Sequence, residues 1–422
     1  MNRRSFLRLT GVIGASSLSP ALLLRAASSP PGNKIVVGIM GLGRGQDLMK
    51  AILGCPEAEI GYLCDVDSNR LAAASNVLSK AGRPNVKAVK DFRKILDDSA
   101  VDALIIATGN YWHAPATIMA CAAGKHVYVE KPGSHNPREG ELMVLAAQKH
   151  RRVVQQGTQR RSFPVIQEGI GRLRSGAIGQ VKFARSWYTN SRPSIGRGKV
   201  VPVPASLDYA LWQGPVPARP YVDNLVHYNW HWRWHWGNGE LGNNGIHYLD
   251  LARWGLGVEY PRSITYNGGR YHFDDDQETP DTGVVTFDFG SCGVSWEHSS
   301  CHPRKPESFP LVNFYGTDGM LSMEGNGYKI FDLNGKMTSQ ASGPGGDQVH
   351  MADFLDSIRQ DRKPSATIEE GQKSTLLCHL GNIAYRVGHV VHFNPEQRQI
   401  EHDAKARKLW SREYRKGWEP RV

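Results

Sequence analysis

Residues 34–45 read Lys34-Ile35-Val36-Val37-Gly38-Ile39-Met40-Gly41-Leu42-Gly43-Arg44-Gly45, and this stretch decides the fold. Its apolar half predicts a buried strand, its alternating glycines a tight turn, and the apolar spacing that follows a helix. Glycines let the backbone approach a pyrophosphate, which the free N–H groups and dipole of the next helix stabilise. The sequence therefore predicts a dinucleotide-binding turn made by Gly41, Leu42, Gly43, Arg44 and Gly45.

A second apolar run, residues 60–64, ends at Asp65, which lies 24 residues after Gly41. In a dinucleotide-binding fold, a carboxylate at this place accepts hydrogen bonds from the adenosine ribose hydroxyls. Such a carboxylate would repel the 2′-phosphate of NADP, so we expect NAD as the cofactor. Asn69 and Arg70 follow closely in the sequence and keep NADP open as the alternative.

Two further strand-like runs lie at residues 101–108 and 125–130, with a helical pattern over residues 114–123 between them. Alternating strands and helices of this length predict a parallel, doubly wound sheet that binds ligands at the carboxyl ends of its strands. Thr108, His113, Glu130 and Lys131 fall at such ends. These four residues therefore join the predicted cofactor site.

Several motifs resemble one family, the Gfo/Idh/MocA group that includes glucose-fructose oxidoreductase and inositol dehydrogenase. The resemblance covers nearly the whole chain after about residue 30. The motifs that carry it are Gly41-Leu42-Gly43, Cys64-Asp65-Val66-Asp67, Ala107-Thr108 with His113, Glu130-Lys131-Pro132, Gly157-Thr158-Gln159, Leu211-Trp212-Gln213-Gly214-Pro215 and the stretch from Gly237 to Asp250. The resemblance implies hydride transfer between a nicotinamide and a sugar or polyol carbon.

The resemblance also implies a two-domain α/β architecture. We expect a Rossmann domain with a doubly wound parallel sheet at residues 33–155. An α+β substrate-binding domain with an open, mostly antiparallel sheet is expected at residues 156–395, and a tail helix at residues 396–422. Association into a homodimer or homotetramer through the outer face of the open sheet is expected by resemblance alone.

Lys131 is the first predicted catalytic residue. By resemblance it lies beside the nicotinamide and the substrate hydroxyl, with Glu130 at the nicotinamide ribose and Gln159 also at the cofactor. A positively charged nicotinamide ring and partial desolvation should lower the pKa of this lysine, which favours proton transfer at neutral pH.

His247 and Asn243 are the other two predicted catalytic residues, and both are also expected to bind substrate. His247 matches the family's catalytic histidine and can take a hydroxyl proton as hydride leaves the same carbon. Asn243 stands one helical turn earlier, where the family usually has aspartate. An amide can hold the substrate or orient the imidazole, but it is not an anion that raises the basicity of the histidine.

A tryptophan-rich stretch, residues 229–236, has Trp at every second position. If extended, it would present an indole face and a basic face. Indoles stack on the C–H faces of sugars, so Trp230, Arg233 and Trp234 are predicted to bind carbohydrate, and Arg160 to add a polar contact. The alternative is an aromatic loop that plugs the domain interface.

Four histidines offer a rival interpretation of the same region. His227, His231 and His235 recur every four residues, and with His247 they would bind a metal if the segment were helical. Alternation of Trp every two residues fits an extended chain better, and no neighbouring Cys or acidic pattern completes a site. We therefore predict no metal.

Residues 1–30 predict a twin-arginine export signal. Arg3-Arg4 precedes Ser5-Phe6-Leu7, an apolar stretch follows, and cleavage is expected near Ala27, with a retained anchor as the alternative. We expect a periplasmic or otherwise extracytoplasmic protein with no membrane span after cleavage. An exported enzyme has no free nicotinamide pool, so we expect a retained cofactor that the reaction itself restores.

The composition fits a two-domain enzyme, with 422 residues of which 40% are hydrophobic and 22% charged. The formal charge of +11 is diffuse, and the sequence has no basic–aromatic module for nucleic acid. A net positive charge favours acidic sugars or an anionic surface as partners. Among six cysteines, Cys64 and Cys121 are expected to be buried thiols, and a bridge between Cys292 and Cys301 is left open.

Three functions follow from these features. The first is an NAD(P)-dependent sugar or polyol oxidoreductase, which Lys131 and His247 favour. The second is an NAD-dependent, redox-neutral glycoside-cleaving or lyase-type enzyme that acts through a keto-sugar. The third is a carbohydrate-binding protein without catalysis, for which Asn243 is the one indication.

Overall fold

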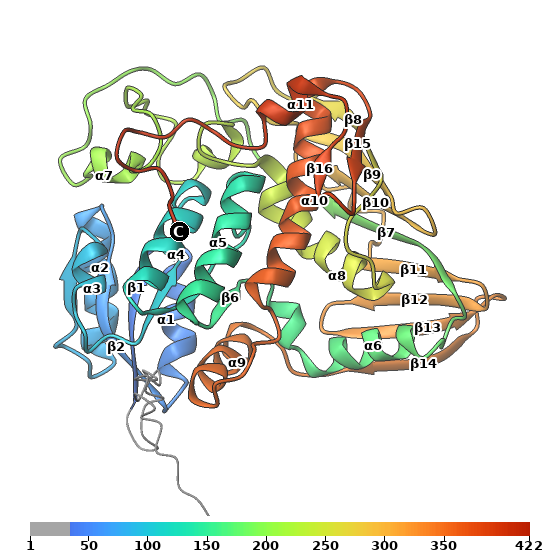
Figure 1. Ribbon diagram of the computed structural model, residues 1–422, viewed down its shortest axis with the longest axis horizontal. Helices are drawn as coiled ribbons and strands as arrows, with labels where there is room; N and C mark the ends of the chain where they lie inside the picture. The colour runs from blue at the N-terminus through green and yellow to red at the C-terminus, as the bar shows by residue number, and fades with distance from the viewer. Residues whose placement is uncertain (1–33) are drawn as a thin grey trace, which may run out of the picture.

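Two sheets of different construction organise the chain (Figure 1). The computed structural model describes residues 34–422, so the predicted export signal at residues 1–30 lies outside the described part. A six-stranded sheet has the order β3-β2-β1-β4-β5-β6, and a ten-stranded sheet has the order β14-β13-β12-β11-β7-β10-β9-β8-β15-β16. The predicted fold class, a Rossmann sheet followed by an open, mostly antiparallel sheet, is confirmed.

Every neighbouring pair of strands in the six-stranded sheet is parallel. Its central strands carry apolar residues on both faces because helices cover both sides. The strands are β1 (Ile35–Met40), β2 (Ala58–Cys64), β3 (Lys87–Val89), β4 (Ala103–Ile106), β5 (His126–Val129) and β6 (Val154–Gln156). Since ligands bind at the carboxyl ends of such strands, this sheet brings the loops after β1, β2, β4 and β5 to one edge.

Helices from both halves of the chain cover this sheet. On one face lie α3 (Arg93–Leu96), α4 (Asn110–Ala122) and α5 (Pro137–His150); on the other lie α1 (Gly45–Leu53), α2 (Ser68–Lys80) and α9 (Asp347–Arg359). Helix α9 comes from far along the sequence, yet Met351, Phe354 and Leu355 are fully buried in the core beside α1 (Figure 1). The predicted division at residues 155 and 156 therefore falls within β6, and the first core includes a helix from beyond it.

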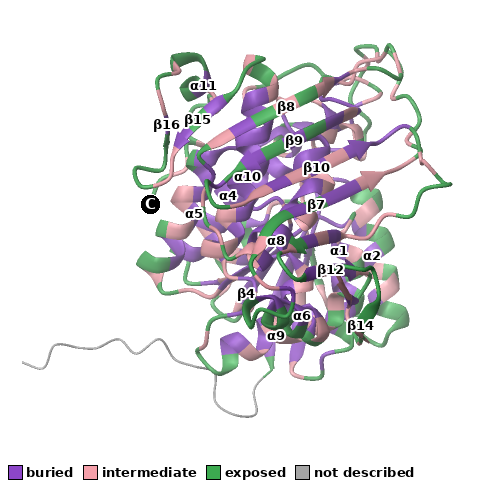
Figure 2. Cartoon of the chain, turned by 90° about the vertical axis from the view of Figure 1, so that its right-hand side faces the viewer, coloured by how far each residue is buried: buried purple, intermediate pink, exposed green. Residues whose placement is uncertain are grey.

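The ten-stranded sheet has helices on one face only. Its strands are β7 (Val181–Thr189), β8 (Ser263–Gly269), β9 (Thr282–Asp288), β10 (Gly293–Ser299), β11 (Val312–Gly316), β12 (Gly319–Glu324), β13 (Gly327–Asp332), β14 (Met337–Ser342), β15 (Val391–Asn394) and β16 (Gln399–Ile400). Only the β7–β10 pair is parallel. Buried and exposed residues alternate along β9, and Figure 2 shows exposed segments on the outer face. The buried face packs on α6 (Pro164–Arg174), α8 (Ile246–Leu256) and α10 (Ile368–Val387).

The C-terminal tail differs from the predicted helix at residues 396–422. It contributes β16, then a single short helix α11 (Ala404–Lys408), and continues without regular structure. Trp418 packs edge-on against Trp112 of α4, with ring centroids 5.2 Å apart, so the tail returns across the Rossmann domain. Tertiary packing, rather than intrinsic helix propensity, decides the conformation of this polar segment.

The predicted state of the cysteines is partly confirmed. Cys64 and Cys121 are buried thiols, as expected. Cys292 and Cys301 are both free, and they flank opposite ends of the seven-residue strand β10. Such a strand spans about 20 Å, whereas a disulfide needs Cα atoms within about 7 Å, so these two residues cannot bridge within this fold.

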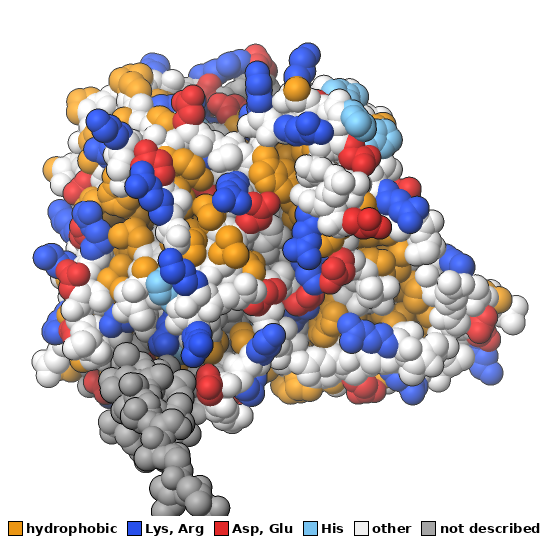
Figure 3. Space-filling view, viewed as in Figure 1, with side chains coloured by type: hydrophobic (Ala, Val, Ile, Leu, Met, Phe, Trp, Pro, Cys, Tyr) orange, Lys and Arg blue, Asp and Glu red, His pale blue; other side chains and the backbone are white. Residues whose placement is uncertain are grey.

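Charged side chains of both signs are interspersed on the face shown in Figure 3. Within residues 34–422, no helix combines the length and apolar character needed to cross a membrane.

Candidate active site

The glycine turn after β1 has the geometry that the sequence predicts. Gly41 has φ of +89°, and a Cβ there would lie 2.5 Å from the carbonyl oxygen of Ala107. The Leu42 N–H donates to Asp65 Oδ2 at 2.7 Å, so the carboxylate at the end of β2 holds the turn. The N–H groups of Gly43 and Arg44 have no hydrogen-bond partner in the described chain, and α1 begins at Gly45.

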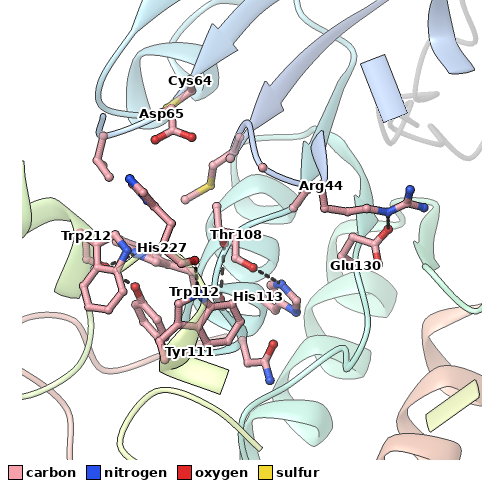
Figure 4. Close-up of a pocket in the computed structure, with 18 of the residues that line it drawn as sticks. Arg44, Cys64, Asp65, Thr108, Tyr111, Trp112, His113, Glu130, Trp212 and His227 are labelled. Atoms are coloured by element: carbon pink, nitrogen blue, oxygen red, sulfur yellow. Dashed lines mark hydrogen bonds and ion pairs between the residues drawn. The ribbon is translucent and has the colours of Figure 1, made fainter. Parts of the chain in front are cut away.

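A cavity of about 460 Å³ opens from this turn, between the carboxyl edge of the parallel sheet and the second part of the chain (Figure 4). The Rossmann residues that line it include Gly41, Gly43, Arg44, Asp65, Thr108, His113, Glu130 and Lys131. Tyr228, Trp230, His231 and Asn243 line it from the other part. The cavity therefore brings together most of the predicted cofactor residues with Lys131 and Asn243.

Arg44 is the centre of a charged cluster beside the turn. Its guanidinium donates to Glu130 Oε1 at 3.1 Å and to Asp347 Oδ2 at 2.7 Å. Gln159 contacts the same Asp347 carboxylate at 3.4 Å. Sequence reasoning missed Asp347, because it lies at the start of α9, more than 300 residues from Arg44.

His113 is a positioning group in this geometry. It is buried, its Nδ1 lies 2.6 Å from the carbonyl oxygen of Pro132, and its Nε2 lies 3.1 Å from that of Thr108 (Figure 4). Burial lowers the pKa of this imidazole. The ring thus ties the start of α4 to the Glu130-Lys131-Pro132 segment.

Lys131 reaches across the cavity to the second part of the chain. Its Nζ donates to the backbone carbonyl oxygen of Asn243 at 2.6 Å. Burial lowers the pKa of the Lys131 ammonium, and the charge of Glu130 acts in the opposite direction. The contact joins the end of β5 to η3 (Leu241–Gly245), a π-helical turn of the kind that recurs at functional sites.

His247 stands on α8, four residues after Asn243, and the predicted helix is confirmed at Ile246–Leu256. Within the described chain, its imidazole has no hydrogen-bond partner. Burial holds the pKa of His247 well below its usual value, and the charges of Lys131 and Arg160 lower it further. The imidazole is therefore neutral at neutral pH, which is the form that accepts a proton.

Glu240 is a site carboxylate that the sequence analysis missed. It is almost fully buried, and it accepts from Arg192 Nε at 2.5 Å and from Asn244 Nδ2 at 2.6 Å. Burial raises the pKa of Glu240, while Arg192 opposes that shift. Its position one turn before Asn243 was visible in the sequence, but its partner Arg192 precedes it by 48 residues.

The tryptophan-rich segment is not the extended strand that its alternation predicts. Residues Asn229–Trp232 form the 3-10 helix η2, and Trp232 and Trp236 are buried. Packing of the indoles in the fold outweighs the alternation of Trp at every second residue, which had predicted a strand. The alternative that the sequence left open, an aromatic plug at the interface, describes most of the segment better.

The predicted carbohydrate-binding residues separate in space. Trp230 lines the cavity and stacks on His231, with ring centroids 3.6 Å apart. Trp234 lines a second cavity with His135 and stacks beneath Arg386.

Two arginines among the predicted carbohydrate-binding residues also lie apart. The Arg233 guanidinium donates to Asn224 Oδ1 at 2.8 Å and to Asp276 Oδ2 at 3.0 Å, so it links the segments that carry these two residues. Arg160 lies on η1 (Gln159–Ser162), which packs against α8.

Three of the four histidines of the rival metal interpretation have separate partners, and His247 has none within residues 34–422. His227 contacts Asp67 at 2.8 Å, His231 contacts the Tyr228 carbonyl oxygen at 2.6 Å, and His235 contacts that of Pro217 at 2.9 Å. Within residues 34–422, no group of three or more His, Cys, Asp or Glu side chains is arranged to hold a metal ion.

The turn fits a dinucleotide. A Cβ at Gly41 or Gly43 would fill the space that the backbone leaves open, and the unpartnered N–H groups at the start of α1 suit a pyrophosphate. Asp65 lines the cavity at the end of β2, where the ribose prediction places it. Arg70 also lines the cavity, close to Gly43, so a nearby cation accompanies the carboxylate.

Comparison with protein families identifies the chain. A profile described as an oxidoreductase family with an NAD-binding Rossmann fold matches residues 35–158. A second, described as an oxidoreductase family C-terminal alpha/beta domain, matches residues 185–292 and 308–420. The chain therefore belongs to the Gfo/Idh/MocA family of oxidoreductases, and its first domain is an NAD-binding Rossmann domain.

Curated relatives share one recurring name. A glycosyl hydrolase family 109 protein of Stenotrophomonas maltophilia is 31% identical over 137 residues, or 31% of this chain and 29% of the relative. One from Saccharopolyspora erythraea is 31% identical over 158 residues, or 36% of this chain and 34% of the relative. These alignments span about a third of each relative or less. One from Parabacteroides distasonis is 23% identical over 85% of both chains.

Solved structures share the fold over most of the chain. Aldose-aldose oxidoreductase from Caulobacter crescentus, complexed with glycerol, has a TM-score of 0.67 at 21% identity and covers 86% of this chain and 100% of its own. Levoglucosan dehydrogenase, complexed with NADH and levoglucosan, has a TM-score of 0.67 at 17% identity and covers 85% and 99%. At these identities the likeness concerns the fold alone.

Proposed function

We propose that this protein is an NAD-dependent oxidoreductase that transfers hydride between the nicotinamide and a hydroxyl-bearing carbon of a sugar or polyol. The observation that carries the proposal is the contact between Lys131 and Asn243. It joins the end of a cofactor-binding strand to the turn that precedes His247. Lys131 and Asn243 line the cavity that starts at the glycine turn, and the neutral imidazole of His247 follows Asn243 by one helical turn.

The residues have separable tasks in this proposal. NAD, when bound at the glycine turn, supplies the hydride acceptor. His247 takes the hydroxyl proton, because its depressed pKa keeps the imidazole neutral. Lys131 donates a hydrogen bond to the same hydroxyl oxygen, and the Asn243 carbonyl fixes its amine. The substrate carbon thus loses one hydride and its oxygen one proton, which leaves a carbonyl group.

The test uses the purified protein with NAD and a panel of sugars and polyols, with formation of reduced nicotinamide as the signal. We expect His247→Gln to lower the rate by about 10²-fold or more while NADH binding is retained. His392→Gln is the matched control, because His392 is exposed on β15, far along the chain from the cavity-lining residues. Equal rates in the two variants would remove His247 from the mechanism.

The relatives named glycosyl hydrolase family 109 proteins favour a second candidate function. In that case a sugar hydroxyl is oxidised and the carbonyl acidifies the neighbouring carbon. That carbon loses its proton as the aglycone is eliminated, water adds to the resulting double bond, and the hydride is returned to the carbonyl. The same lysine and histidine would serve both reactions. Release of nitrophenol from nitrophenyl glycosides without net NADH would support the glycoside-cleaving reaction, and stoichiometric NADH would support the oxidoreductase.

The predicted export, the retained cofactor and the oligomer remain proposals. The twin-arginine pattern in residues 1–30 supports export, and an exported enzyme needs a cofactor that does not dissociate. Denaturing the purified mature protein should release nearly one nicotinamide per chain. Rapid exchange of the bound cofactor with added NAD would exclude retention, and light scattering would report the oligomeric state.

A further inference from the structure

Two adjacent arginines on η1 differ in their partners. Arg161 is 3% exposed and its guanidinium is paired with Asp250, with Nε 2.9 Å from both carboxylate oxygens. Arg160 has no carboxylate oxygen within 4.0 Å and no side-chain hydrogen bond among residues 34–422, and its Nε is buried. Single nitrogens of Arg161, Arg233 and Arg270 also lack a partner, but each of those guanidinium groups has a carboxylate.

An anion would compensate the charge of Arg160, whose side chain is half-buried. A guanidinium stays charged in proteins, and burying a charge without a counter-charge is costly. Burial lowers the pKa of Arg160, and no carboxylate opposes that shift. The fold must therefore supply compensation from elsewhere or leave the position for a ligand.

Arg160 lies between the two elements that carry the proposed chemistry. Segment η1 follows β6, which pairs with β5, the strand that ends at Glu130-Lys131. The neighbouring Arg161 binds Asp250, three residues after His247 on α8. Burial lowers the pKa of His247 and raises that of Tyr248; the charge of Arg160 adds to the first shift and opposes the second, as expected for a cation beside the start of α8.

The cations nearest to Lys131 and Glu240 already have partners. Arg44 is paired with Glu130 and Asp347, and Arg192 with Glu240. Lys131 is held by a carbonyl oxygen, with Glu130 and Glu240 close enough to influence it. Arg70 and Lys90 also line the cavity without an ion pair among residues 34–422, but they lie beside the turns after β2 and β3. Beside α8, Arg160 is left without a matching carboxylate in the same part of the chain.

We infer that the substrate is a sugar acid and that Arg160 binds its carboxylate while the hydroxyl at the reacting carbon lies between Lys131 and His247. The inference rests on the proposed function and names its substrate class. The planar fork of an arginine matches a carboxylate with two parallel hydrogen bonds. A uronate offers a carboxylate and ring hydroxyls on one small molecule, so a single ligand satisfies both parts of the site.

The test compares D-glucuronate, D-galacturonate and D-mannuronate, each with its neutral hexose, by calorimetric binding to the NADH-loaded enzyme. We expect at least one uronate to bind about 10-fold or more tightly than its hexose, the range of a charge-assisted hydrogen-bond pair. Arg160→Gln should abolish this preference and leave NADH affinity unchanged, and Arg160→Lys should restore part of it. Arg172→Gln, at an exposed arginine of α6, removes the same charge and should leave the preference intact.

Several outcomes would overturn the inference. If neutral hexoses bind and react as well as the uronates, the inference about the sugar acid is wrong, whereas the proposed function stands. A loss of NADH affinity in Arg160→Gln would assign the arginine to the cofactor instead. An enzyme that binds NADH but neither binds nor oxidises any member of the panel would contradict both the inference and the proposed function.

Discussion

The two walls of the cavity are built in different ways. The cofactor wall consists of loops that directly follow β1, β2, β4 and β5, so the parallel sheet alone places Gly41, Asp65 and Lys131. The opposite wall combines Trp230, Asn243 and their neighbours from a 3-10 helix and a π-helical turn. The first wall depends on backbone geometry, and the second on packing between distant segments.

This difference predicts where single substitutions act. Changes in the cofactor wall should alter NAD affinity or the chemical step directly, whereas changes in the opposite wall should alter substrate affinity and pH dependence. Four substitutions probe this division, and they are ordered from the largest expected effect to the smallest.

Lys131→Met should have the largest effect. It removes the amine that joins the end of β5 to η3 and leaves the Asn243 carbonyl without its donor. We expect hydride transfer to fall by about 10²- to 10⁴-fold in single-turnover measurements, with NADH affinity within about threefold. Lys149→Met, near the end of α5, is the control. A Lys131 variant with near-normal single-turnover rates would separate the lysine from the chemistry.

Gly41→Ala should chiefly impair the cofactor wall. The added Cβ meets the Ala107 carbonyl oxygen, and the residue is forced to keep a positive φ. We expect NAD affinity to fall by about 100-fold, measured by calorimetry. Gly82→Ala is a matched control, because Gly82 also has positive φ (+74°) but has open space around a Cβ. Similar losses in both variants would point to general destabilisation rather than to the turn.

Trp230→Leu compared with Trp234→Leu tests the opposite wall. Trp230 lines the active-site cavity, whereas Trp234 lines the second one. Loss of an aromatic surface should raise KM for the substrate about 10-fold in the Trp230 variant and leave it unchanged in the Trp234 variant. Because Trp230 is also buried, melting temperatures should accompany the kinetics. The reverse pattern of KM values would place the sugar in the second cavity.

The pH dependence should give the smallest effect. Only the neutral imidazole accepts the proton, so kcat/KM is maximal above the His247 pKa and falls as pH drops through it. Since that pKa is depressed, the acidic limb should lie well below pH 6.5. Asn243→Asp adds an anion one turn away, which raises the imidazole pKa and should move the limb upward by about one unit. An unchanged or lowered limb would show that another group controls it.

The sequence predicted most of the cofactor wall because its signals are local. A strand, a glycine turn and a helix occupy residues 35–53 without interruption, and Asp65 follows at a spacing set by one crossover. The alternation of Trp in residues 229–236 predicted an extended strand, which is wrong. Burial of the indoles against Tyr111 and Trp212 outweighs a short periodic pattern. The role of Asp347 and the pairing of Arg192 with Glu240 were not predictable from the sequence, since the partners lie far apart along the chain.

The sequence by itself determined the class of protein, the doubly wound parallel sheet of its first domain and the identity of Lys131 and His247 as the residues to examine. Those features follow from backbone sterics, hydrophobic periodicity and motifs that are read over short distances. Only the tertiary structure decided that α9 completes the Rossmann core, that Glu240 is paired and that Arg160 is not. Charge compensation depends on which side chains meet in space, and long-range contacts decide that.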